Sequence, residues 1–175
     1  MSTLYNMEAA NLFLGSGDET GSFLRMKNVK VPDLKEMKET HEPGGGLMAI
    51  DLGMGILESL MLTFELHGVN ADAVTQFMPA GPRSLTYTVR GNVVDVRTDA
   101  EVPVVSVITG RMMGIETKEF ERSSGTTESY EICEVKKYQV FFNNNEVLFF
   151  DFASSVHRRD GVQVNGTRNR NLGIA

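Results

Sequence analysis

The chain has 175 residues, of which 41% are hydrophobic and 23% charged, so it is long enough for one globular domain with a buried core. Its formal net charge of −6 argues against a protein whose whole surface binds nucleic acid, because phosphate binding needs a basic field. A lone cysteine, Cys133, excludes an intrachain disulfide framework. No stretch approaches the roughly 20 apolar residues that cross a bilayer, so we expect no membrane insertion. The N-terminus lacks a basic region followed by an apolar run, so we expect no secretory signal.

The first distinctive element is an extended arm or loop at about residues 28–48. A helix could begin at Asp33, where Glu36 is placed for a capping box, but so few apolar residues follow that an exposed strand or arm is equally consistent. Residues 43–53 read PGGGLMAIDLG, and a triple glycine after a proline fits neither a helix nor a central strand. We therefore predict a hinge or contact loop that consists of Pro43, Gly44, Gly45, Gly46, Leu47 and Met48.

The next segment alternates with the period of two that is typical of a strand. One face of this strand is predicted to carry Leu60, Leu62, Phe64 and Leu66. The other face is predicted to carry Met61, Thr63, Glu65 and His67. Glu65 therefore points away from the apolar row.

A short helix is predicted near Ala71–Met78. Asn70 is placed to cap it, Asp72 lies in its positive first turn, and Val69 and Val74 have the spacing of a hydrophobic staple. Its apolar stripe is predicted to consist of Val74, Phe77 and Met78.

The second half of the chain is typical of β structure. Leu85, Tyr87 and Val89 alternate with polar residues, and the phase slips at Gly91, which predicts a bulge there. Val102–Thr117 and Ser129–Phe142 are long β-rich runs, and the turns at 143–145 and 160–161 predict hairpins. The expected fold is a mainly β (α+β) single domain over residues 1–175. It would be an antiparallel β-barrel or sandwich with one packed helix and extended loops or arms.

The usual signatures of catalysis and ligand binding do not occur in this sequence. Gly15-Ser16-Gly17 begins like a dinucleotide-binding loop, but Thr20 stands where the third glycine belongs. The three histidines are far apart in sequence and no cysteine pair exists, which argues against a structural metal site. Cys133 lies in a β-rich run and is better interpreted as a small core residue than as a nucleophile. We therefore predict no enzymatic activity, no metal and no cofactor.

Charge is distributed unevenly along the chain. No Lys or Arg occurs from Glu39 to Pro82, whereas the C-terminal part carries Arg158, Arg159, Arg168 and Arg170. One interpretation is a solvated acidic face with a basic tail. The other is self-association, in which opposite ends of the subunit meet in neighbouring copies. The sequence leaves both open.

The order of short motifs resembles that of the major tail tube protein family of contractile phage tails. The matching segments of the first half are Asn11-Leu12-Phe13, the glycine turn Gly15–Gly17, Val31–Leu34, Gly44–Met48 and Ile50–Gly53. Those further along are Phe64–Gly68, Gln76-Phe77, Asp151-Phe152 and Val164–Gly166. The similarity covers nearly the whole chain, although the first turn is longer here and the tail after Asn165 is short and rich in Arg and Asn.

This resemblance implies a barrel-like subunit that forms homohexameric rings, which stack into a hollow tube inside a contractile sheath. The triple-glycine arm would then reach a neighbouring subunit or the next ring, and Glu65 would be a candidate for the lumen. DNA would pass through without specific binding, because a strongly acidic ring repels phosphates. The implied partners are the tail sheath, the baseplate or tube initiator and the tail terminator. The implied location is the virion tail, assembled in the host cytoplasm.

Three other classes remain open at this point. The chain could be the tube protein of a related contractile injection machine, such as a tail-like bacteriocin or a secretion-system tube. It could be a β-barrel module that binds a small ligand or glycan, although the absence of Trp counts against an aromatic platform. It could also be an enzyme with dispersed catalytic residues, although no motif in the sequence supports this class.

Overall fold

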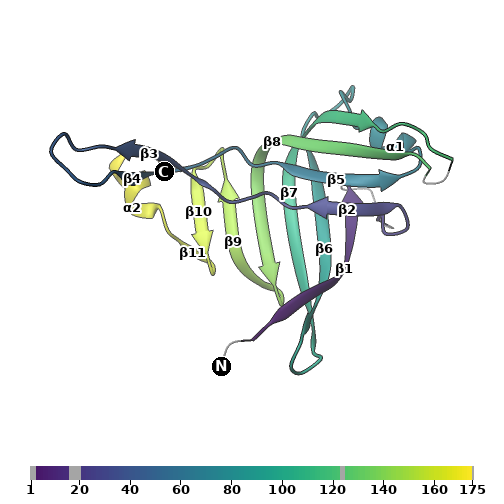
Figure 1. Cartoon of the computed structure of the whole chain (residues 1–175), viewed down its shortest axis with the longest axis horizontal. Coiled ribbons are helices and arrows are strands. Elements are labelled where there is room, and N and C mark those ends of the chain that lie inside the picture. The colour runs from purple at the N-terminus through teal and green to yellow at the C-terminus, as the bar shows by residue number, and fades with distance from the viewer. Residues whose placement is uncertain (1–2, 16–20, 123–124, 175) are drawn as a thin grey trace.

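The computed structural model describes residues 3–15, 21–122 and 125–174 (Figure 1). Part of the predicted first turn, from Ser16 to Thr20, lies outside these residues. The fold is mainly β and antiparallel, as the sequence predicts. The first strands are β1 (Tyr5–Leu14), β2 (Met26–Lys30), β3 (Glu36–His41), β4 (Ile50–Leu57) and β5 (Leu62–His67). After helix α1 (Ala71–Val74) come β6 (Leu85–Asp95), β7 (Glu101–Thr117), β8 (Thr127–Phe142) and β9 (Asn145–Asp151). The chain ends with β10 (Val156–Arg159), β11 (Val162–Gln163) and helix α2 (Gly166–Asn171).

The main sheet is a curved sheet of nine strands. Its continuous path runs β1-β6-β7-β8-β9-β10-β11, while β5 branches from β8 and carries β2 at its other edge. The first half of β8 pairs with β5 and its second half with β9, and Glu134 lies between the two halves with a φ of 47°. Strands β2 and β5 consequently cross over β6–β8 as a second layer (Figure 1). The pairings among the described residues do not close this curved sheet into a barrel.

The core lies between these two layers. The predicted apolar row is confirmed, because Leu62, Phe64 and Leu66 are essentially inaccessible to solvent. Phe64 stacks on Tyr130 of β8 with ring centroids 4.9 Å apart. Further large apolar and aromatic side chains that are fully buried among the described residues are Leu12, Tyr87, Ile108, Met112 and Ile132.

The predicted bulge at Gly91 is wrong. Burial alternates without interruption through Tyr87, Val89, Gly91 and Val93, and β6 pairs with β7 in one unbroken register. The irregularity lies in the facing strand β1, between Met7 and Ala9. A β-carbon on Gly91 would lie 2.9 Å from Met7 Cε, so this glycine allows a close approach rather than a change of phase.

Both predicted hairpins are confirmed. Asn143 and Asn144 adopt φ values of 49° and 62° between β8 and β9, and Asp160 and Gly161 adopt 48° and 75° between β10 and β11. Positive φ at both central residues is the geometry that a two-residue hairpin turn needs, and Asn, Asp and Gly tolerate it.

The helix near residue 71 is shorter than predicted and is anchored differently. Its buried residue is Ala73, whereas the predicted stripe of Val74, Phe77 and Met78 is exposed, and so is Val69. Asn70 does occupy the N-cap position, but its side chain makes no capping hydrogen bond. No helix of the described residues is long and apolar enough to span a membrane.

Candidate functional site

The arm is a β-hairpin that projects from one end of the molecule (Figure 1). Strands β3 and β4 pair only with each other, from Glu36↔Leu57 to His41↔Ile50. Every residue from 33 to 56 is exposed. Of the two interpretations of this segment, the exposed strand is confirmed and no helix begins at Asp33. Residues 28–30, which the prediction included in the arm, belong to β2 within the sheet.

The triple glycine lies at the tip of this hairpin. The turn is closed by a hydrogen bond from the Gly46 amide to the Pro43 carbonyl at 3.0 Å. A β-carbon on Gly44 or Gly45 would meet nothing within 4 Å, whereas one on Gly46 would lie 2.5 Å from Pro43 Cγ. The two residues that follow the turn, Leu47 and Met48, are 108% and 77% exposed. The predicted contact loop is therefore the most solvent-exposed apolar segment of the arm.

The base of the arm is held by polar contacts between its two strands and by a hydrogen bond from the C-terminal helix. Glu36 Oε1 accepts a hydrogen bond from the Gly55 amide at 2.7 Å, and the Gly55 carbonyl accepts one from Arg168 Nη1 at 2.9 Å. Lys38 forms an ion pair with Asp51 across the two strands. The sequence signalled neither α2 nor its contact with the arm, because the partners are more than 100 positions apart.

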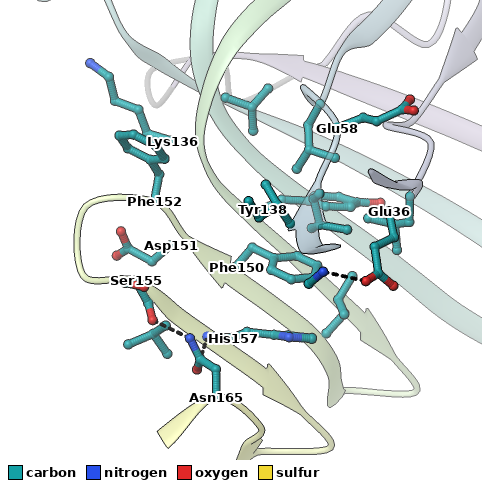
Figure 2. A pocket seen from close by; sticks show the side chains of 18 of the residues that line it. Glu36, Glu58, Lys136, Tyr138, Phe150, Asp151, Phe152, Ser155, His157 and Asn165 are labelled. Atoms are coloured by element: carbon teal, nitrogen blue, oxygen red, sulfur yellow. Dashed lines mark hydrogen bonds between the residues drawn. The ribbon is translucent and has the colours of Figure 1, made fainter. Parts of the chain in front are cut away.

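A cavity of about 1070 Å³ lies where the arm base, β8–β10 and α2 meet (Figure 2). His157 stacks on Phe150 inside it, with ring centroids 4.3 Å apart, and its backbone amide donates to Asn165 Oδ1. Burial lowers the pKa of His157, so its ring is neutral at pH 7. Apolar side chains on its wall include Leu34, Leu60, Tyr138, Leu148, Leu172 and Ile174.

Glu65 lies on the outer face of β5, as predicted, but its charge is compensated. Its carboxylate is 2.5 Å from Lys118 Nζ and 3.1 Å from Lys27 Nζ, and it accepts hydrogen bonds from Asn28 and Ser129. The hydrogen bonds from the two lysines lower the pKa of Glu65 from 4.5 to about 2. With two cations around one anion, the surface near Glu65 carries no excess of negative charge. The location of Glu65 in a lumen stays a prediction, and the local charge does not favour it.

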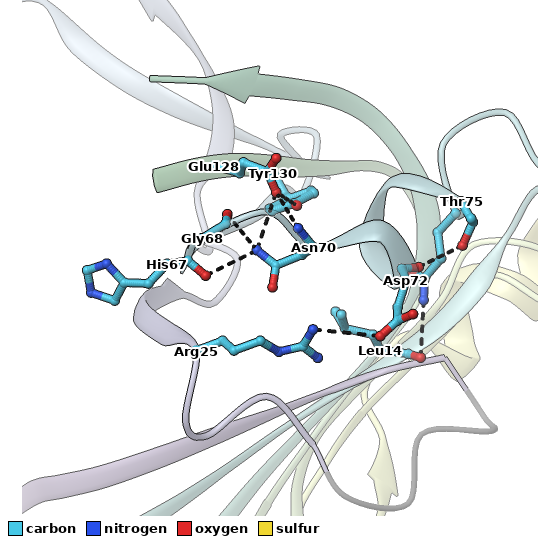
Figure 3. A network of polar contacts seen from close by, with 10 residues as sticks. Leu14, Arg25, His67, Gly68, Asn70, Asp72, Thr75, Glu128 and Tyr130 are labelled. Carbon is cyan, nitrogen blue, oxygen red and sulfur yellow. Dashed lines mark hydrogen bonds and ion pairs between the residues drawn. The ribbon is translucent and has the colours of Figure 1, made fainter. Parts of the chain in front are cut away.

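A buried polar network joins the loop before α1 to β8 (Figure 3). The Glu128 carboxylate, only 4% exposed, accepts hydrogen bonds from Tyr130 Oη, the Asn70 amide and Asn70 Nδ2. Asn70 Nδ2 also donates to the carbonyls of His67 and Gly68. These contacts explain why Asn70 does not cap the helix, since its side chain is used to fix the loop instead.

The network gives a prediction about stability. Tyr130→Phe is expected to lower the free energy of unfolding by about 1.5–3 kcal/mol, because it removes a hydrogen bond to a buried charged group. Tyr87→Phe is the matched control, since the Tyr87 hydroxyl is buried without a partner among the described residues and its removal is expected to be neutral or stabilising. Urea denaturation of both variants measures the difference. Equal losses in the two variants would contradict the assignment.

The described residues contain no group of three or more His, Cys, Asp or Glu side chains placed to hold a metal ion. The other features of the described residues that stand out are the exposed arm, the cavity at its base and the sheet edges that have a partner on one side only.

Comparison with known proteins agrees with a role in assembly. A family model described as phage tail tube protein FII matches residues 6–173. A solved sheath/tube terminator of an extracellular contractile injection system is similar in fold, with a TM-score of 0.52 and 9% identity over 76% of this chain and 93% of that chain. A chain of the sheath-tube complex of such a system gives 0.51 and 8% over 76% and 88%. No curated protein sequence matches. At these identities the two structures show the fold alone.

Proposed function

This chain belongs to the phage tail tube protein FII family, and from that membership we propose that its copies form hexameric rings that stack into the inner tube of a contractile tail. The observation that carries the proposal is the family match, which extends over residues 6–173. The tube would be the conduit through which DNA is ejected into the host. Its partners would be the tail sheath, the baseplate or tube initiator and the tail terminator. The protein would act structurally, without catalysis or cofactor, as part of a virion assembled in the host cytoplasm.

Unpaired strand edges support this proposal. Among the described residues, β1, β2 and β11 each have a partner on one side only, and the two arm strands pair only with each other. Exposed edges invite pairing with another chain, and a closed ring of copies removes them. A net charge of −6 per chain would also let DNA pass, because an excess of negative charge disfavours phosphate binding.

Negative-stain electron microscopy of the purified protein over a concentration series tests the proposal. We expect six-fold rings or hollow tubes that become more numerous as the concentration rises. Where nucleation limits growth, the protein is expected to add to the ends of preformed tubes or to a cognate baseplate. A protein that stays monomeric and also fails to add to these ends would contradict the tube function.

A second candidate is the tube protein of a related contractile injection machine, such as a tail-like bacteriocin or a secretion-system tube. The similarity in fold to two structures of an extracellular contractile injection system favours it. The two candidates share the same subunit and differ in what travels through the tube. Genes for a capsid and a DNA-packaging motor beside this one would support the phage tail, and their absence the other machine.

A further inference from the structure

We propose that the segment Gly53-Met54-Gly55 is the hinge of the arm and that Arg168 of helix α2 locks this hinge in one direction. The segment lies in β4, near the base of the arm. The hinge and its lock both lie within one subunit, so neither depends on the proposed tube.

The pairing of the two arm strands is irregular at this segment. The register shifts between Glu36 and Lys38, where one residue of β3 lies opposite three residues of β4. Extra residues on one strand of an antiparallel pair bend that strand. Gly55 adopts a φ of 68°, a backbone conformation that residues with a side chain rarely adopt. The arm therefore contains a bulge at its base, and a glycine allows the backbone conformation of this bulge.

The Glu36 side chain holds the bulge from the facing strand. Its Oε1 accepts a hydrogen bond from the Gly55 amide at 2.7 Å. A β-carbon on Gly53 would also lie 2.7 Å from this oxygen, so a side chain at residue 53 would displace the carboxylate. The two glycines thus have different functions, since Gly53 leaves room for Glu36 and Gly55 adopts the positive φ.

Helix α2 connects the bulge to the body of the molecule. The Gly55 carbonyl accepts a hydrogen bond from Arg168 Nη1 at 2.9 Å. The helix is itself fixed to the turn between β9 and β10, because the side-chain amides of Asn165 and Asn169 donate to the Ser155 carbonyl at 2.6 and 2.7 Å. Asn169 is only 6% exposed, so solvent hardly competes for this contact. Arg168 therefore joins a fixed helix to the bulge.

Little else restrains the direction of the arm. Strands β3 and β4 pair only with each other, and every residue from 33 to 56 is exposed. Within the described part of the chain, the bond from Arg168 is the only hydrogen bond that joins β3 or β4 to a residue beyond 58. An element with few buried contacts reorients readily unless specific contacts hold it. Loss of the Arg168 side chain should therefore let the arm swing about the bulge.

Distances between two spin labels, measured by pulsed electron spin resonance, test the proposal. In a Cys133→Ala background, one label is attached to Leu47→Cys at the arm tip and the other to Val96→Cys, which is 55% exposed and lies beyond β6. The protein is kept below the concentration at which it associates. We expect one narrow distance distribution for the labelled parent and a distribution at least about twofold wider for Arg168→Ala. Arg170→Ala is the matched control, because Arg170 lies in the same helix but donates no hydrogen bond to the arm.

A second pair of variants tests the contact on the other side of Gly55. Glu36→Gln keeps an oxygen that can accept from the Gly55 amide and should keep the narrow distribution, whereas Glu36→Ala should widen it. Both variants leave α2 unchanged, so they give an answer even if Arg168→Ala weakens that helix.

Two outcomes would overturn the proposal. One is a distribution as narrow as that of the parent in both Arg168→Ala and Glu36→Ala. The other is an equal widening in Arg170→Ala, because the effect would then come from α2 as a whole and not from the hydrogen bond to Gly55.

Discussion

Replacing Leu47 and Met48 together with aspartate is expected to abolish tube growth and to leave the subunit folded. Both side chains are exposed in the isolated chain, so their loss removes no contact from the core. In an assembled tube each would lose the burial of an apolar side chain, worth about 1.5–3 kcal/mol. Since about 1.4 kcal/mol corresponds to a factor of ten in an equilibrium constant, the concentration needed for assembly should rise at least about a hundredfold.

Two measurements check this result. Thermal unfolding is expected to give the same midpoint for the variant as for the parent, and electron microscopy is expected to show neither rings nor tubes at concentrations where the parent assembles. Val69→Asp is the control, because Val69 is 81% exposed but lies in the loop between β5 and α1, at the end of the molecule opposite the arm (Figure 1). Normal assembly of the double variant would show that the arm tip makes no contact that matters. Equal loss of assembly in the control would show that the arm has no special role.

The pattern of core strands such as β5 and β6 could be predicted from the sequence because each of them buries one face only. The alternation of apolar and polar residues at 60–66 is therefore visible in the sequence itself. The Asn and Asp-Gly turns identify the two hairpins because these residue types tolerate the positive φ that such turns need. The arm was also recognisable, since a triple glycine after a proline excludes regular central structure.

Features that depend on distant partners could not be predicted in the same way. The apolar residues near α1 look like a core stripe, yet they are exposed, because only Ala73 faces the sheet. Gly91 interrupts the apolar pattern in the sequence, but the reason for a glycine there is the close approach of the Met7 side chain from the facing strand. The cavity and the contact between Arg168 and Gly55 join segments more than 100 residues apart, and no local pattern reports such a pair.

The compensated charge of Glu65 leads to the second large effect. Glu65→Lys is expected to destabilise the subunit by about 1.5–3 kcal/mol, because it removes the acceptor of hydrogen bonds from two half-exposed lysines and adds a third cation beside them. A loss of this size is a sizeable fraction of the stability of an ordinary domain, so the variant should unfold at a lower urea concentration. Urea denaturation of the soluble fraction measures it. A change below about 1 kcal/mol would mean that the two ion pairs contribute no more than ordinary surface pairs do.

The pH dependence of stability separates the charge of Glu65 from its packing. Its pKa is about 2 in the folded chain and is expected near 4.5 when unfolded, so the stabilisation is complete above about pH 4.5 and is lost as the pH falls toward 2. Each pKa unit corresponds to about 1.4 kcal/mol, and solvent screening reduces the loss to about 1–2 kcal/mol. Glu65→Gln keeps the shape but cannot titrate, so its stability should fall less over the same range. If Glu65→Gln and the parent lose stability in parallel between pH 4.5 and 2, then other carboxylates cause the acid sensitivity. In that case the two lysines would fix the position of Glu65, but its charge would contribute little to the free energy of unfolding.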